Sequence, residues 1–241
     1  MLFRSDLVGP AHGALPSLNT NHSPVRSLTE PRVLLRAALA GALTAAACYP
    51  RLANWGQRTD SVWFLVAAMT WAGFVMWAAV FAWQERHGHH EVFPRQVPAR
   101  LWLLAAGLGL GGAVMSHYWG DPLLRQLAPT DFPRNPAQWT EHLLFNLALE
   151  QLFLCFAPFA FFVRLLPRVK AAAVATVLFS LLVLALKLQS LKAPPTWDVM
   201  LGLMLFRALH SSVTLWLYLR GGAWLVWLFA ALLLSRHWWS F

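Results

Sequence analysis

The chain has 241 residues, of which 58% are hydrophobic and only 12% are charged, and its mean hydropathy is +0.51. A charged fraction of about half the usual value excludes an ordinary soluble domain and predicts a polytopic membrane protein. The formal net charge is +9, but lysine and arginine are spread over the loops. We therefore expect contacts with membrane lipids and no nucleic-acid partner.

The chain divides into a polar start and a long apolar remainder. Residues 1–32 are rich in Gly, Pro, Ser and Asn and predict a flexible N-terminal tail. Residues 33–241 predict one transmembrane domain, because long apolar runs favour helices, whose backbone groups are satisfied within the lipid. The predicted fold class is an all-α polytopic membrane protein with about seven transmembrane helices in one bundle. The candidate spans are residues 33–49, 61–83, 101–119, 143–163, 171–186, 199–219 and 223–235.

Several connections between these spans carry predictions of their own. The segment HGHHE at 87–91 has histidines that could hold a transition metal, but a solvated loop is the preferred interpretation. Residues 120–141 contain four prolines and predict a long loop, and Arg220-Gly-Gly222 predicts a tight turn. We expect no metal and no cofactor.

The fourth span, Leu143–Val163, carries Glu150 and Gln151 near its middle. A carboxylate at that depth costs on the order of 3 kcal/mol on insertion scales, so it usually faces a protein interior or a water-filled cavity. His142, Asn146 and Glu150 follow at i, i+4 and i+8, which places them on one helical face. Two interpretations stay open: a structural acid satisfied by a neighbouring helix, and a catalytic site.

The sixth span, Val199–Leu219, carries a polar stripe. Arg207, His210, Ser211 and Thr214 follow the i, i+3, i+4, i+7 pattern of one helical face. We predict that Arg207 and Glu150 face the same interior cavity and can pair. A carboxylate and a histidine around a water suffice for peptide-bond hydrolysis, and the same residues suit a proton relay or a structural pair.

Motifs in the C-terminal part, residues 143–241, resemble those of a protease family. Glu150-Gln-Leu-Phe-Leu-Cys155 is similar to its Glu-Glu-x-x-x-Arg motif, and Tyr218-Leu-Arg-Gly-Gly-Ala-Trp224 is similar to its Tyr-Leu-Arg-x-Gly stretch. The family is that of the CPBP intramembrane proteases, which includes the CAAX prenyl endopeptidases and the bacteriocin-processing or abortive-infection type. The resemblance implies that Glu150 activates water for hydrolysis of a membrane peptide, and it implies a bacterial inner (plasma) membrane location.

The chain departs from the family at several motif positions. Gln151 replaces the second glutamate, Cys155 replaces the arginine, and Val183 stands where the second motif has a histidine. The histidine of the last motif falls near Ala230, so a zinc site of three protein ligands is not expected. Glu150 is the one catalytic position that carries over.

Two hypotheses follow from this mixture of match and departure. The first is an intramembrane protease with a rewired site, in which Glu150 and His210 are catalytic and Gln151, Arg207 and Asn146 support them. The second is a catalytically inactive relative, which serves as a membrane scaffold or binds a membrane protein partner. A small transporter is a third and weaker alternative.

Overall fold

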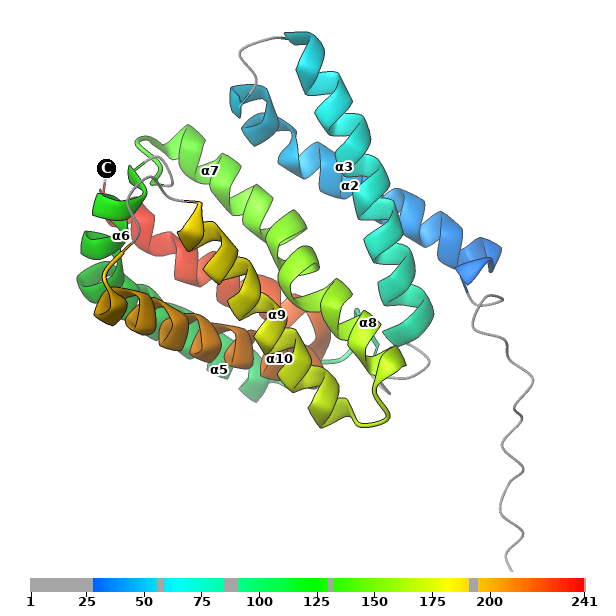
Figure 1. Cartoon of the computed structure of the whole chain (residues 1–241). Coiled ribbons are helices and arrows are strands. Elements are labelled where there is room, and N and C mark those ends of the chain that lie inside the picture. The colour runs from blue at the N-terminus through cyan, green and yellow to red at the C-terminus, as the bar shows by residue number, and fades with distance from the viewer. Residues whose placement is uncertain (1–27, 56–58, 85–90, 130–131, 191–194, 241) are drawn as a thin grey trace, which may run out of the picture.

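A computed structural model describes residues 28–55, 59–84, 91–129, 132–190 and 195–240 of the chain. Within these ranges the regular structure is entirely helical. Six helical stretches there are long and apolar enough to cross a membrane. The protein is therefore an integral membrane protein with an all-α fold, as the sequence predicted (Figure 1).

The helices follow the predicted spans but extend beyond them. Most of the predicted tail, 1–32, lies outside the described residues, and the first helix already begins at Pro31. Several crossings are built from an α-helix that continues directly into a π-helical turn. The elements are α2 (Pro31–Trp55), α3 (Thr59–Ala79) with η1 (Val80–Gln84), α5 (Ala99–Met115) with η2 (Ser116–Gly120) and α6 (Asp121–Leu127), α7 (Pro136–Phe145) with η4 (Asn146–Glu150), η5 (Leu152–Phe156) and α8 (Ala157–Leu165), α9 (Val169–Gln189), and α10 (Trp197–Leu234) with the 3₁₀ segment η6 (Ser235–Ser240).

Helix α10 contains a reversal that produces the sixth and seventh predicted spans. Gly221 and Gly222 leave the helical conformation, and Gly222 has φ of 67°, a region that favours glycine. The amide of Ala223 donates to the carbonyl of Val92 at 2.9 Å, which fixes the turn. The rings of His210 and Phe229 then lie 5.4 Å apart, so the two arms of α10 run side by side. The predicted tight turn is confirmed.

The predicted long loop at 120–141 is wrong, because helices occupy most of it. Helix α6 covers Asp121–Leu127, and α7 begins at Pro136. Proline fits the first turn of a helix, where its missing N–H would have had no partner. Asn135 caps α7 by accepting a hydrogen bond from the amide of Gln138 at 2.9 Å. Two of the four prolines, Pro122 and Pro136, therefore mark helix starts, and the other two lie in the connection between α6 and α7.

The central helix, from α7 to α8, holds the bundle together. Helices α2 and α3 pack against each other on one side of it, while α5, α9 and α10 lie on the other (Figure 1). Helices α2 and α3 approach each other closely at Gly41. A Cβ on this residue would lie 2.6 Å from the backbone nitrogen of Phe74. Toward α10, the fully buried Tyr218 stacks on Phe156 with ring centroids 4.5 Å apart. Both sides thus anchor the segment that carries Glu150.

Candidate functional site

Glu150 lies where the central helix is locally widened. Two π-helical turns, η4 and η5, flank Gln151, whose backbone N–H bonds to the carbonyl of Asn146. Such turns are rare and frequently occur at functional sites, because the additional residue redirects the neighbouring side chains. The sequence pattern predicted a regular helix here and contains no signal for either π-helical turn.

A short chain of side-chain hydrogen bonds orients the Glu150 carboxylate. The Nε2 of Gln151 donates to the Oδ1 of Asn146 at 3.0 Å. The Nδ2 of Asn146 in turn donates to the Oε2 of Glu150. The amide of Asn146 is therefore oriented by one neighbour and holds the other, and Gln151 is buried. The sequence had placed Asn146 and Glu150 on one helical face together with His142, and Gln151 was a predicted supporting residue.

Arg207 is held by Ser180 of α9, which also accepts from Ser211 of α10. Its Nε donates to the Oγ of Ser180 at 2.7 Å, and the hydroxyl of Ser211 also donates to Ser180, at 2.8 Å. Ser180 is fully buried. Among the described residues, Arg207 and Glu150 form no ion pair, and the Nε of Arg207 bonds Ser180 instead.

Glu150 and the polar stripe of α10 nevertheless line one inner pocket. Its volume is about 30 Å³, which is room for roughly one or two water molecules. The hydroxyl of Thr214 is buried there without a hydrogen-bond partner. A water beside Glu150 could satisfy this hydroxyl. The described residues that line the pocket are Asn146, Glu150, Gln151, Leu154, Cys155, Thr176, Arg207, His210, Ser211 and Thr214. The predicted common cavity of Glu150 and Arg207 is thus present, and His210 also lines it.

A larger outer cavity of about 290 Å³ adjoins the inner pocket and shares Asn146, Glu150, Arg207 and His210 with it. Four cationic side chains line it, namely Arg51, Lys187, Arg207 and Arg236, and so do His142 and His237. These residues come from five different helical segments, and most lie near helix ends at the end of the bundle that holds the C-terminus (Figure 1). Glu150 is the one acidic residue among the described lining residues. The cavity is therefore strongly electropositive.

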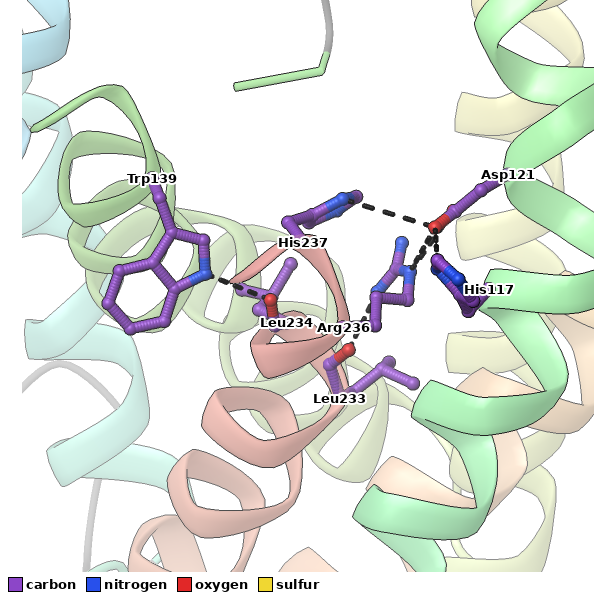
Figure 2. Close-up of polar contacts among 7 residues, drawn as sticks. All are labelled: His117, Asp121, Trp139, Leu233, Leu234, Arg236 and His237. Carbon is purple, nitrogen blue, oxygen red and sulfur yellow. Dashed lines mark hydrogen bonds and ion pairs between the residues drawn. The ribbon is translucent and has the colours of Figure 1, made fainter. Parts of the chain in front are cut away.

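A second acid and a second base, Asp121 and Arg236, are paired at positions outside the predicted spans. Asp121 is 2% exposed, and its carboxylate accepts from the Nε of Arg236 at 3.1 and 3.3 Å. The Nδ1 atoms of His117 and His237 each lie 4.0 Å from the same carboxylate (Figure 2). The sequence analysis placed Asp121 in a loop and Arg236 in a terminal tail. A proline at the second position of α6 was the available signal for a helix there.

An apolar groove of about 260 Å³ meets the outer cavity. It lies between α5 and the two arms of α10 and includes Gly107, Gly111 and Gly112. A Cβ on Gly107 or Gly111 would meet nothing within 4 Å, so these two glycines leave open space in the groove. Phe206, His210 and Leu233 line both the groove and the outer cavity.

Cys48 and Cys155 are both buried and form no disulfide. The part of the chain that the structure describes has no group of three or more histidine, cysteine, aspartate or glutamate side chains able to hold a metal ion. The histidines of HGHHE lie outside the described residues. No family model, curated protein or solved structure matches this chain.

Proposed function

We propose that this protein is an intramembrane peptide hydrolase in which Glu150 activates a water. The observation that carries the proposal is that Glu150, Arg207 and His210 line one pocket with room for water. The motif resemblance to CPBP intramembrane proteases supports the same reaction class. The same resemblance points to a bacterial inner (plasma) membrane, and the proposed substrate is a membrane peptide or protein.

The proposed reaction needs one water and no other reactant. The Glu150 carboxylate takes a proton from water, and the resulting hydroxide adds to the peptide carbonyl carbon. Arg207 stabilises the negative oxygen of the tetrahedral intermediate, because a fixed cation in a dry site acts strongly on developing charge. The C–N bond then breaks, and the proton passes to the leaving amine through His210. The products are a new carboxylate and a free amine.

The hydrogen bonds of the site fit these roles. Asn146 holds the Oε2 atom of Glu150 and orients the carboxylate. Ser180 fixes the Nε side of Arg207 and so positions its guanidinium. The apolar groove that reaches His210 supplies a route from the lipid phase for a membrane peptide.

The test is hydrolysis of transmembrane peptides in water enriched with oxygen-18. The full chain is purified, reconstituted into vesicles and incubated with a panel of peptides that each carry one apolar span. Cleavage is expected to place one heavy oxygen at the new C-terminus, detected by mass spectrometry. Glu150→Gln should lower the rate by at least about 100-fold. The control is Glu91→Gln, which changes an exposed carboxylate that is far from Glu150 in the sequence.

A second candidate function is a non-catalytic membrane scaffold or partner-binding protein. The hydrogen-bond chain from Gln151 through Asn146 to Glu150 favours it, since one carboxylate oxygen is already satisfied without substrate. Equal heavy-oxygen incorporation by wild type and Glu150→Gln would refute the hydrolase. If no peptide in the panel is cleaved, the scaffold becomes the better assignment.

A further inference from the structure

The hydroxyl of Thr214 is a buried group of the inner pocket that the rest of the protein does not use. Thr214 is 3% exposed, and its Oγ1 has no hydrogen-bond partner among the described residues. Of the described residues that line the pocket, no other has a buried polar side-chain atom in this state. A buried hydroxyl without a hydrogen bond is costly, so this atom points to a water or a ligand beside it.

The orientation of the Thr214 side chain differs from that of other threonines in this bundle. A threonine inside a helix can donate its hydroxyl to the carbonyl four residues earlier. Four described threonines do so, at distances between 2.8 and 3.0 Å, namely Thr44, Thr70, Thr140 and Thr176. The corresponding acceptor for Thr214 is the carbonyl of His210, and that bond is not formed. The hydroxyl is therefore available to the pocket that Thr214 lines.

Glu150 supplies the second group that a water at this place needs. The Oε2 atom of its carboxylate accepts from Asn146, which leaves Oε1 to accept a hydrogen bond from water. The pocket has a volume of about 30 Å³, which is room for roughly one or two water molecules. Because Glu150 and Thr214 both line so small a space, one water can bond both side chains.

The two cavities place this water at the inner end of the site. Glu150, Arg207 and His210 line both the inner pocket and the outer cavity, whereas Thr214 lines only the inner pocket of the two. Thr214 follows Arg207 by seven residues, which corresponds to roughly 10 Å along the helix. A peptide carbonyl that approaches Arg207 from the outer cavity would therefore meet the water from the side opposite to Thr214.

From these observations we propose that Thr214 and Glu150 jointly hold one water, and that this water is the nucleophile of the proposed hydrolase. Thr214 donates its hydroxyl proton to the water oxygen, and the water donates one proton to the Oε1 of Glu150. When that proton passes to Glu150, the oxygen gains negative charge, and the hydrogen bond from Thr214 becomes stronger. The resulting hydroxide adds to the peptide carbonyl carbon. The role in catalysis rests on the proposed function, whereas the water site does not.

The water site is tested without activity, by a crystal structure of the full chain grown in a lipidic mesophase. In the wild type we expect density for one water within about 2.6–3.2 Å of both the Oγ1 of Thr214 and the Oε1 of Glu150. Thr214→Val removes the hydroxyl with little change in shape and should lose this density, whereas Thr214→Ser should keep it. A wild-type pocket without this water, or density that persists in Thr214→Val, would overturn the site.

The role in catalysis is tested with the oxygen-18 peptide assay. Thr214→Val should lower kcat at least about tenfold and change KM less than about twofold, because the lost hydrogen bond strengthens only as hydroxide forms. Thr214→Ser should keep kcat within about threefold of the wild type. The matched control is Thr70→Val, which should keep the wild-type kcat, because the Thr70 hydroxyl bonds the carbonyl of Val66 in its own helix and Thr70 lines neither cavity.

The outcomes separate this inference from the proposed function. A wild-type chain that cleaves no peptide refutes the hydrolase and the catalytic role of the water, while the density still decides the water site. If the wild type is active and Thr214→Val loses no more activity than Thr70→Val, the role of Thr214 is refuted and the Glu150 hydrolase stands. Thermal unfolding of each variant in the same detergent identifies any that fails to fold, and Thr214→Ala then serves as a second variant without the hydroxyl.

Discussion

At the scale of single residues, Ser180 is the side chain on which the site depends most. It is fully buried and receives hydrogen bonds from both Arg207 and Ser211. A serine in an apolar span is unremarkable by itself, and Ser180 was not among the predicted site residues. It is important because two residues of α10 donate hydrogen bonds to it, and no sequence pattern within α9 predicts these contacts.

Replacing Ser180 should therefore lower the free energy of unfolding more than replacing a nearby serine does. Ser180→Ala removes the acceptor of Arg207 and of Ser211, and we expect a loss of about 1–3 kcal/mol in unfolding free energy. Ser212→Ala is the matched control, since the Ser212 hydroxyl is exposed and bonds only within its own helix. It should change stability by less than about 0.5 kcal/mol. Denaturant unfolding in detergent micelles measures both, and equal losses would contradict the role assigned to Ser180.

At the scale of elements, the reversal in α10 is what brings the polar stripe and the C-terminal arm together. The turn depends on Gly222, where a Cβ would lie 2.4 Å from the carbonyl oxygen of Val92. The positive φ at this residue adds a backbone cost for any side chain. Both effects act on the same short segment, so this turn tolerates no residue other than glycine without a shift.

Gly222→Ala should destabilise the protein by about 2 kcal/mol or more, because strain and the contact with Val92 add. Gly202→Ala provides the comparison, since a Cβ there meets nothing within 4 Å. Alanine is the better helix former, so this variant should gain up to about 1 kcal/mol. The melting midpoints of the two proteins in detergent should move in opposite directions. If both move alike, the turn is not what limits stability.

At the scale of the whole molecule, one buried ion pair closes the end of the bundle. Asp121 belongs to α6 and Arg236 to η6, so the pair ties the third crossing to the C-terminus. The Nε1 of Trp139 donates to the carbonyl of Leu234 at 2.9 Å and fastens the same arm to α7 (Figure 2). This end of the molecule also contains the outer cavity.

Replacing one partner of this ion pair should destabilise the protein more than replacing both partners. Asp121→Leu leaves Arg236 buried without its partner and should cost about 3–5 kcal/mol. The double variant Asp121→Leu, Arg236→Leu should recover at least half of that loss, because no isolated charge remains. A double-mutant cycle of unfolding free energies measures the recovery. Simple addition of the two single losses would show that the residues do not act as a pair.

The sequence by itself determined the class of protein and the main polar positions. Long apolar runs can only be helices in lipid, because a lipid-exposed backbone must bond within its own segment. The same logic made Glu150 and Arg207 conspicuous, since a charge in such a run must face an interior. The paired glycines at 221 and 222 marked the turn, because they allow a backbone conformation that other residues avoid.

The tertiary structure alone decided how these residues combine. Glu150 and Arg207 form no ion pair among the described residues; Asn146 bonds the carboxylate and Ser180 bonds the guanidinium instead. Asp121 and Arg236 lie 115 residues apart and meet only through packing. The charge of the outer cavity likewise depends on which helix ends lie together. Local sequence fixes neither the π-helical turns nor contacts between distant helices, since both depend on the packing of the whole bundle.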